Sequence, residues 1–425
     1  MTVTITPGGL RGSVCAPASK SAVHRLLLCA ALAEDESRLH CASWSEDIQA
    51  TARCLRALGA EVAQAGEWIC VSPIRAGVSS AALRCGESGS TLRLLLPVAA
   101  ALGVQAGFQG SGRLPSRPIE PLAGELVRHG CSIWQEGDTV WLNGRLRNGD
   151  YTLPGDVSSQ FISGLLFALP LLEGDSTLEV TGDVESQGYI AMTEQTIRSF
   201  GVRFTREGWR YHIPGRQRYR TPGRLIPEGD WSAAAVWLAA GALSGPVTVT
   251  GLDMSSLQED KQVVELLRAL GAEITWESDG VTASKGRLAG LMIDGAQIPD
   301  VIPALCVAAA GAEGESRVHH AARLRLKESD RLDSTAQMLC SLGARAAVQD
   351  DGLTVTGNTA LTGGTAPCAG DHRIVMAAAA ASILCEAPVV IPGAQAVRKS
   401  YPQFFDDFTK LGGRLTTQTE GAETA

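Results

Sequence analysis

The sequence predicts an α/β protein assembled from six similar units of about 71 residues, which form two domains of three units each. Three observations support this class: a recurring glycine after an amphipathic segment, a polar helix opening with the same period, and a polar break midway along the chain. A length of 425 residues alone would suggest about three average domains. Six units of about 71 residues account for the whole chain, so the repeat defines the organisation.

Six glycines recur at intervals of 71, 71, 70, 72 and 69 residues. Each follows the last turn of an amphipathic segment and precedes a β-prone run, as in LRALGAEV. They are Gly59, Gly130, Gly201, Gly271, Gly343 and Gly412. Because glycine readily takes the left-handed conformation that ends a helix, each one predicts a joint between a helix and a strand.

Polar or glycine-rich residues open an alanine- and leucine-rich helix with the same period. The steps are 70, 69, 72, 69 and 71 residues when measured from Lys20, Ser90, Ser159, Trp231, Asp300 and Asp371. Each unit is therefore expected to hold one buried helix, one surface helix and several short strands.

These openings are either ordinary N-caps or helix N-termini that bind anions. Lys20, Arg93 and Arg373 lie at three of them, where positive charge is unfavourable unless a bound anion compensates it. The positive charges at these three openings therefore favour the second interpretation, in which the helix N-termini bind anions.

Residues 215–227, GRQRYRTPGRLIP, are polar, rich in arginine and interrupted by proline and glycine, which is typical of a linker. The predicted first domain spans residues 18–227, and the second contains residues 228–425. By composition alone, the segment before Pro17 could join either half.

Composition and missing motifs exclude several classes of protein. With 45% hydrophobic and 19% charged residues the chain is expected to fold, and its net charge of −8 argues against a nucleic-acid binder. Its 11 cysteines form no C-x-x-C pair, which argues against a zinc ribbon or a disulfide framework. Walker A, dinucleotide-binding and zinc-protease motifs are lacking. No leader or membrane-spanning run is evident, so a cytoplasmic protein is expected.

Further cations occur in RLPSRP, LRLKESDRL and VRKSYP. In the second of these, a helix would place Lys327 and Arg331 on one face with Glu328 adjoining. That face is either a solvated charged surface or part of an anion site.

Several motifs occur together in a characteristic order. They are PASKSAVHR, GESGSTLR, LPSRPIEPL, DVSSQFISGLL, EGDWSAAA, LKESDRL, GDHRIVMA and RKSYPQFF. This set resembles the 5-enolpyruvylshikimate-3-phosphate synthase (3-phosphoshikimate 1-carboxyvinyltransferase) family. The resemblance implies the enolpyruvyl transferase fold, an inside-out α/β barrel with two domains of three βαβαββ-like units around buried helices. It also implies that residues 1–17 join the second domain and that the active site lies in the cleft between the domains.

The reaction that the resemblance implies transfers the enolpyruvyl group of phosphoenolpyruvate to the 5-hydroxyl of shikimate 3-phosphate and releases phosphate. No metal or organic cofactor is expected, because protein cations would neutralise the leaving phosphate. The two substrates are the expected partners, with no nucleic acid or membrane, and the protein is expected to be monomeric. A glycine at position 89 leaves room at the phosphoenolpyruvate site, which predicts inhibition by glyphosate.

The resemblance also assigns the site residues. Shikimate 3-phosphate would contact Lys20, Ser21, Arg25, Ser158, Ser159, Gln160, Ser186, Tyr189, Asp300 and Lys327. Phosphoenolpyruvate would contact Lys20, Gly89, Arg93, Arg117, Gln160, Arg331, His372, Arg373 and Lys399. Asp300 is assigned to the proton of the 5-hydroxyl and Glu328 to the methylene carbon, with Lys20 as a further proton-transfer candidate.

Four positions depart from the usual family pattern: Glu87 replaces an asparagine, Gln187 and Gly188 replace a Lys-Pro pair, and Arg323 replaces an amide. Two alternatives remain. A UDP-N-acetylglucosamine enolpyruvyl transferase would need a reactive cysteine within residues 107–117, where this sequence has none. A non-catalytic, anion-binding member of the fold would be expected to lose Asp300 or Glu328.

Overall fold

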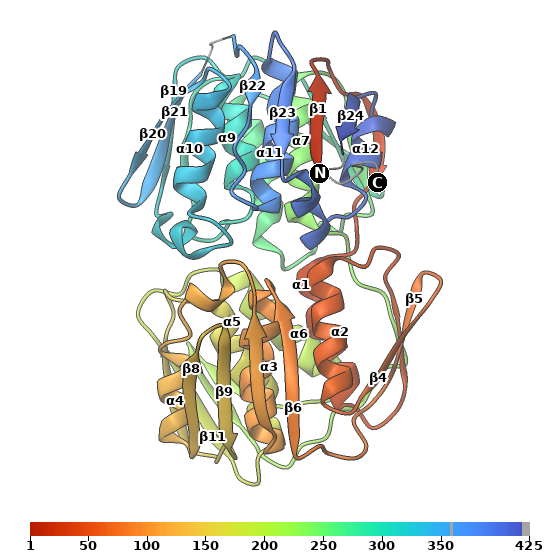
Figure 1. The fold of residues 1–425 in the computed structure, drawn as a ribbon, viewed down its shortest axis with the longest axis vertical. Helices are drawn as coiled ribbons and strands as arrows, with labels where there is room; N and C mark the ends of the chain where they lie inside the picture. Colours follow the sequence, from red (N-terminus) through yellow and green to blue (C-terminus); the bar gives the residue numbers. More distant parts are fainter. Residues whose placement is uncertain (358–359, 419–425) are drawn as a thin grey trace, which may run out of the picture. The chain divides into compact units, whose positions relative to one another are not determined.

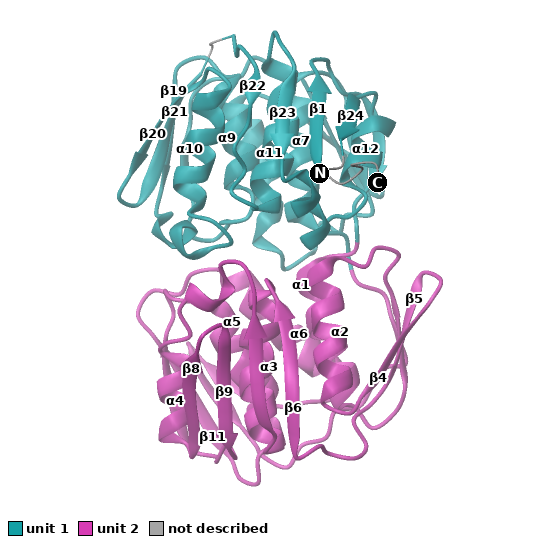
Figure 2. Ribbon diagram, in the orientation of Figure 1, with its two compact units in different colours: residues 1–17, 228–425 teal, residues 18–227 magenta. Residues whose placement is uncertain are grey.

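The computed structural model describes residues 1–357 and 360–418. The chain divides into two compact units (Figure 2). Unit 2 contains residues 18–227, and unit 1 contains residues 1–17 and 228–425. Within the described residues, each unit contains three four-stranded sheets.

In unit 2 the sheets have the orders β14-β3-β5-β4, β6-β7-β9-β8 and β10-β11-β13-β12. Their strands are β3 (Ser37–His40), β4 (Glu61–Ala65), β5 (Trp68–Ser72), β6 (Ser80–Gly86), β7 (Gln105–Gly110), β8 (Cys131–Glu136), β9 (Thr139–Gly144), β10 (Asp150–Pro154), β11 (Ser176–Thr181), β12 (Thr205–Glu207), β13 (Arg210–Ile213) and β14 (Arg224–Leu225).

In unit 1 the sheets have the orders β16-β17-β15-β2, β18-β19-β21-β20 and β22-β23-β1-β24. Their strands are β1 (Thr2–Thr6), β2 (Gly12–Cys15), β15 (Val247–Thr250), β16 (Glu273–Trp276), β17 (Gly280–Ser284), β18 (Met292–Asp294), β19 (Glu315–His319), β20 (Arg345–Gln349), β21 (Gly352–Thr356), β22 (Gly364–Thr365), β23 (Val389–Pro392) and β24 (Arg414–Gln418).

All six sheets share one pattern, in which a parallel pair is followed by two antiparallel neighbours. The N-terminal segment completes two of them: β1 lies between β23 and β24 (Figure 1), and β2 pairs with β15. The main-chain hydrogen bonds of these strands hold residues 1–17 in unit 1.

Each unit surrounds three apolar helices with its sheets and three further helices. The inner helices are α1 (Lys20–Leu32), α3 (Gly89–Leu102) and α5 (Ser159–Ala168) in unit 2, and α7 (Trp231–Leu243), α9 (Ile302–Ala310) and α11 (His372–Ala381) in unit 1. The remaining helices are α2 (Glu46–Ala57), α4 (Leu122–Arg128), α6 (Gln187–Ser199), α8 (Val263–Leu270), α10 (Arg331–Ser341) and α12 (Phe404–Lys410). All 13 residues of α7 are buried, as expected for a helix that is apolar on every face.

The predicted helix-to-strand joints are confirmed. All six marker glycines have a positive φ, between 81° and 107°. At Gly271 a Cβ would lie 2.2 Å from the carbonyl oxygen of Arg287, so both the conformation and the close packing require glycine. The repeated α/β fold predicted from the sequence is confirmed.

One local prediction was wrong. Residues 327–329 form a bend, because Asp330 caps α10 by accepting from the Asp333 N–H at 3.2 Å and the helix begins only at Arg331. Lys327 and Arg331 therefore do not share a helical face. Asp300 lies just before α9, which begins at Ile302, so it stands at a helix opening as predicted.

Residues 215–227, predicted to be a linker, are packed into unit 2 and do not form a free connection. Tyr219 is fully buried and donates a hydrogen bond to the Phe167 carbonyl at 2.8 Å, and β14 pairs with β3. These contacts make residues 215–227 part of unit 2. Among the described residues, no helix combines the length and apolar character needed to cross a membrane.

Candidate active site

The functional side chains of unit 2 lie around the N-termini of its three inner helices. Ser19, Ser88 and Ser158 cap α1, α3 and α5 by accepting hydrogen bonds from backbone N–H groups. The remaining N–H groups and the positive ends of the helix dipoles favour an anion at such positions.

Lys20, the first residue of α1, forms an ion pair with Asp47 of α2, with 3.0 Å between Nζ and Oδ2. Only 12% of the Lys20 side chain and 10% of the Asp47 side chain are exposed. The pair fixes the ammonium group at the helix opening and keeps a carboxylate within proton-transfer distance of it.

A buried chain of hydrogen-bonded side chains connects α1, α2 and α3. His24 Nδ1 lies 2.8 Å from Thr51 Oγ1, Thr51 lies 2.7 Å from Thr91 Oγ1, and Thr91 donates to Ser88 at 2.8 Å. The chain therefore joins α1, α2 and the cap of α3. Burial lowers the pKa of His24 well below its ordinary value, so its ring is neutral at neutral pH.

Arg25 connects α1 to α6. Its guanidinium donates to Thr193 Oγ1 at 2.8 Å, to the Ser21 carbonyl at 2.8 Å and to the Tyr189 carbonyl at 2.7 Å. Burial lowers its pKa to about 10, which still leaves it charged at neutral pH. Arg25 therefore holds Ser21 and Tyr189 near each other at the start of these helices. Ser186, also predicted to bind substrate, precedes α6 with a φ of 53°.

Gln160 connects α5 to α3. It accepts from Arg93 Nη1 at 3.0 Å and donates to Ser90 Oγ at 2.9 Å. Arg93 also donates to the Pro118 carbonyl at 3.1 Å. The amide of Gln160 is thus oriented by both helices. The adjoining Ser158 and Ser159 lie at the cap and the first residue of α5.

Gly89 and Arg117 are in direct contact. A Cβ at position 89 would lie 2.8 Å from Arg117 Nη1, well inside van der Waals distance. The guanidinium of Arg117 therefore occupies the space that glycine leaves at the start of α3.

In unit 1, Arg331 lies at the centre of a cluster of carboxylates. Nη1 contacts Asp300 at 2.7 Å, Nη2 contacts Glu328 at 2.6 Å, and Nε contacts Asp371 at 2.8 Å. Only 1% of the Arg331 side chain is exposed. Burial opposes its charge, but Asp371, Glu328 and Asp300 outweigh that effect and raise the pKa of Arg331 well above its ordinary value.

Asp371 holds this cluster in place through several hydrogen bonds. It is fully buried, caps α11 by accepting from the Arg373 N–H at 2.9 Å, and also accepts from Ser329 Oγ at 3.0 Å. One carboxylate therefore fixes the start of α11, the bend before α10 and the guanidinium of Arg331.

Asp300 is surrounded by cations. Besides Arg331, it contacts Arg373 Nη2 at 3.3 Å and Lys327 Nζ at 3.9 Å. Burial alone would raise the pKa of Asp300, but Arg331, Arg373 and Lys327 together lower it well below its usual range. Asp300 is therefore an ionised carboxylate at neutral pH, the form that can accept a proton.

The pKa of Lys327 is also lowered in these surroundings, but burial is the cause. Burial lowers its pKa to about 8, although Asp300 and Glu328 oppose the shift. A quarter of its side chain, 25%, remains exposed. Lys327 is thus mainly charged at neutral pH and loses that charge in mildly alkaline solution.

The structure brings most of the predicted residues of unit 1 into this cluster. Asp300, Lys327, Glu328, Arg331 and Arg373 are linked by direct contacts, and Lys399 donates to the Gly370 carbonyl beside it at 2.7 Å. His372 is placed differently, since its side chain is 1% exposed and lies against Asp371 at 3.8 Å. It is therefore part of the buried support.

Three supporting residues were not assigned a role from the sequence: Asp47, Ser232 and Asp371. Ser232 lies between Arg373 Nη2 and Asp230, with 2.5 Å to each partner. Asp371 was identified from the sequence as a helix opening, but not as a partner of Arg331; it caps α11, whose second residue is Arg373. Asp47 has only a weak signal, an acidic residue in the first turn of a helix.

Comparison with known proteins identifies the family of this chain. The family described as EPSP synthase (3-phosphoshikimate 1-carboxyvinyltransferase) matches residues 5–408. The chain belongs to the EPSP synthase family. The resemblance inferred from the motifs is thereby confirmed, and the predicted activity is the one that the family description names.

Individual EPSP synthase relatives cover the chain almost completely. A 3-phosphoshikimate 1-carboxyvinyltransferase of Clostridium kluyveri is 40% identical over 423 residues, which are 99% of each chain. One of Clostridium acetobutylicum is 39% identical over 419 residues, 97% of each chain.

Solved structures show the same fold. EPSP synthase from Acinetobacter baumannii has a TM-score of 0.81 at 25% identity and covers 98% of this chain and 100% of its own. The enolpyruvyl transferase NikO from Streptomyces tendae has a TM-score of 0.79 at 20% identity, with 98% of both chains covered, which supports the fold alone.

Proposed function

We propose that this protein transfers the enolpyruvyl group of phosphoenolpyruvate to the 5-hydroxyl of shikimate 3-phosphate and releases phosphate. The observation that carries this proposal is the contact of Arg331 with both Asp300 and Glu328. The Arg331 guanidinium contacts the two carboxylates through different nitrogen atoms, and further cations lie beside them. That arrangement provides two acid/base groups next to charges that can bind anionic substrates.

Different cationic residues are assigned to the two anionic substrates. We assign phosphoenolpyruvate to Arg117 and Gly89 in unit 2 and to Arg331, Arg373 and Lys399 in unit 1. Arginine presents parallel N–H groups that match a carboxylate or a phosphate, which suits a substrate carrying both.

Shikimate 3-phosphate is assigned to the hydroxyl and cationic groups around α1, α5 and α6. The N-terminus of α5, with Ser158 and Ser159, offers N–H donors to the phosphate. Ser21 and Tyr189, which Arg25 holds together, and Lys327 complete the proposed set.

The proposed reaction has two steps. In the addition step, the 5-hydroxyl oxygen bonds to C2 of phosphoenolpyruvate, Asp300 accepts the hydroxyl proton, and Glu328 delivers a proton to the methylene carbon. In the elimination step, Glu328 takes a proton back from the resulting methyl group, the double bond forms again, and the bond from C2 to the phosphate oxygen breaks with its electrons passing to the phosphate. Protein cations stabilise the departing phosphate.

Substrate binding would also adjust the basicity of Asp300. Arg331 and Arg373 lower the pKa of Asp300 in the substrate-free protein. An anionic substrate bound to these arginines would partly neutralise them and so raise that pKa. Asp300 would then become a stronger base when phosphoenolpyruvate is present.

Phosphate release by the purified full-length protein tests the proposal. The expected result is phosphate production that requires both phosphoenolpyruvate and shikimate 3-phosphate. Release with UDP-N-acetylglucosamine in place of shikimate 3-phosphate would contradict the proposed acceptor. Binding of both substrates without any release would instead identify a non-catalytic member of the family.

The proposed enzyme acts as a monomer and draws its acid/base groups from one chain. Sedimentation of the active protein tests that arrangement, and a dimer at the concentrations used for the assay would contradict it.

A further inference from the structure

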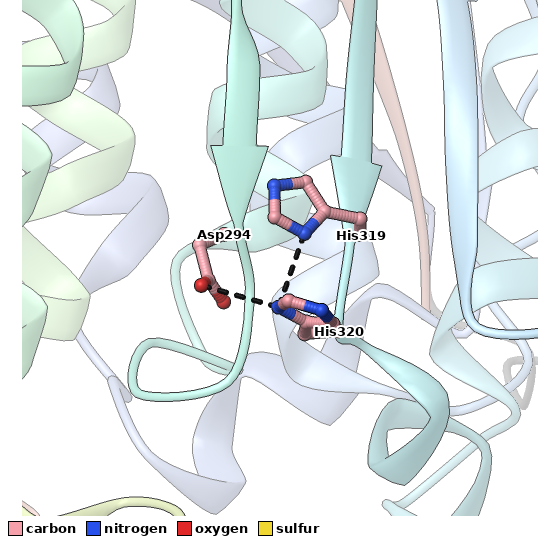
Figure 3. A group of neighbouring side chains, drawn as sticks. All are labelled: Asp294, His319 and His320. Carbon is pink, nitrogen blue, oxygen red and sulfur yellow. Dashed lines mark hydrogen bonds and ion pairs between the residues drawn. The ribbon is translucent and has the colours of Figure 1, made fainter.

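We propose that Asp294, His319 and His320 of unit 1 form a binding site for a divalent transition-metal ion, and that Zn²⁺ is the ion it suits best (Figure 3). Each residue offers one ligand atom, and these atoms all lie within 4.8 Å of one another. None of the three belongs to the proposed active site.

The sheet brings two of these residues together. Asp294 is the last residue of β18 and His319 is the last residue of β19. The two strands are parallel, and Asp294 pairs in register with His319. Because residues in register on neighbouring strands project to the same face of a sheet, the carboxylate and the imidazole meet at the end of the sheet.

A backbone turn adds the third ligand. Consecutive residues of a strand would point to opposite faces, but His320 has a φ of 51° in the left-handed region. Its N–H donates to Asp351 Oδ2 at 3.3 Å, and the Ala321 N–H donates to the Asp351 carbonyl at 2.8 Å. This turn places the His320 ring against that of His319, with 4.4 Å between ring centroids.

A single proton on His320 Nδ1 cannot point directly at both of its neighbours. His320 Nδ1 lies 3.1 Å from His319 Nδ1 and 3.2 Å from Asp294 Oδ2. A proton on His320 Nδ1 can serve one of these contacts, whereas a proton on His319 Nδ1 leaves the Asp294 contact without a hydrogen. A cation, in contrast, accepts lone pairs from all three atoms at once.

The distances also suit a metal ion. Ligands about 2.0–2.1 Å from zinc are about 3.3 Å apart when they are arranged tetrahedrally. The two contacts of His320 Nδ1, at 3.1 and 3.2 Å, lie near that value. The side chains of His320 and Asp294 are 61% and 58% exposed, so they can rotate to close the remaining pair. Two imidazoles and one carboxylate suit Zn²⁺ rather than Ca²⁺ or Mg²⁺, and water would fill the fourth position.

The position of the site suggests a structural effect. The segment after Asp294 leads to Asp300, and the segment after His320 leads to Lys327 and Glu328. An ion shared by the ends of β18 and β19 would tie the starting points of both segments. We therefore expect bound zinc to stabilise unit 1, without taking part in the proposed reaction.

The sequence did not predict this site because its ligands do not form a motif. Residue 294 is 25 positions from residue 319, and only the pairing of two parallel strands brings them together.

Calorimetric titration of the full-length, chelator-treated protein with ZnCl₂ tests the proposal, using a chain without added histidines. The expected result is one site per chain, with affinity at least about tenfold weaker in Asp294→Asn and His319→Gln. His212→Gln is the matched control, because His212 is an exposed strand histidine in unit 2. Its affinity should equal that of the parent. A parent that binds no zinc, or variants that bind as the parent does, would overturn the proposal.

A second measurement applies if either variant fails to fold. Electron paramagnetic resonance of the parent with one equivalent of Cu²⁺ reports the nitrogen atoms bound to the metal. Two imidazole nitrogens are expected, and a spectrum with fewer would contradict the proposed ligand set.

Discussion

Arg331 and Asp371 form an ion pair that is almost completely removed from solvent. The distance between Nε and Oδ2 is 2.8 Å, and their side chains are 1% and 0% exposed. Because Asp371 also caps α11, the pair connects the Arg331 guanidinium to this inner helix of unit 1. The charge of Arg331 is thus balanced inside the protein, and its orientation depends on a residue that does not contact substrate in our proposal.

Replacement of Asp371 by asparagine should destabilise the protein. Asparagine can still cap α11, but it leaves the buried Arg331 with one fewer negative charge. The free energy of unfolding should fall by about 3–5 kcal/mol, the usual cost of breaking a buried pair. Urea denaturation measures the change.

Asp330→Asn is the matched control for that experiment, because Asp330 caps α10 in the same way but its side chain is 27% exposed. Its effect should stay below about 1 kcal/mol. Equal effects of the two substitutions would show that capping, rather than the charge on Arg331, accounts for the role of Asp371.

Loss of either proposed acid/base carboxylate should slow the reaction while substrate binding persists. Asp300→Ala or Glu328→Ala is expected to reduce turnover by about 10²- to 10⁴-fold. Phosphate release gives the turnover, and calorimetry gives the binding of each substrate. Asp333→Ala, which removes a half-exposed carboxylate nearby, should leave turnover unchanged. A variant within about threefold of the parent would rule out the assigned role of that carboxylate.

The rate should fall in mildly alkaline solution because Lys327 loses its charge there. Its pKa of about 8 lies below the ordinary lysine value of 10.5, so the cationic form disappears as the pH rises through 8. The kcat/KM for shikimate 3-phosphate should decrease across that range. Lys327→Arg keeps the positive charge and should remove the decrease. A decrease that persists in Lys327→Arg would assign the titration to another group.

The same pKa shift has an opposite effect on stability. The folded protein binds fewer protons at Lys327 than the unfolded chain does between pH 8 and 10.5. The contribution of this residue to the free energy of unfolding therefore rises with pH in that window. Thermal denaturation of the parent and Lys327→Arg, compared at the two ends of the window, measures the difference.

A methyl group at position 89 should disturb phosphoenolpyruvate binding through Arg117. The new Cβ would lie 2.8 Å from Arg117 Nη1, so the guanidinium must move. We expect Gly89→Ala to raise the KM for phosphoenolpyruvate by about tenfold or more, because small displacements of positioning groups are costly. It should also reduce inhibition by glyphosate, which the parent is predicted to show.

Gly77→Ala provides the control for that substitution, because no atom lies within 4 Å of its added Cβ. Its kinetic constants should match those of the parent. Ordinary turnover of the parent in millimolar glyphosate would contradict the predicted sensitivity.

Much of the fold could be predicted from the sequence because its signals are local. A glycine that ends a helix, such as Gly271, depends on its own backbone conformation, and an apolar helix such as α7 must be buried wherever it lies. The repetition of these signals gave the six units. The bend at residues 327–329 was missed because capping by Asp330 competes with helix propagation, and periodicity does not reveal which prevails.

The sequence by itself determined the repeated α/β units, the family and the identity of the charged residues available for the reaction. Only the tertiary structure decided which charges meet. Asp300, Arg331 and Asp371 lie far apart along the chain, and their contacts at 2.7 and 2.8 Å set the protonation of the cluster. The same holds for Asp294 and His319. Electrostatic and coordinate interactions act over a few ångströms in space, and only the paired strands and packed helices bring such residues within that range.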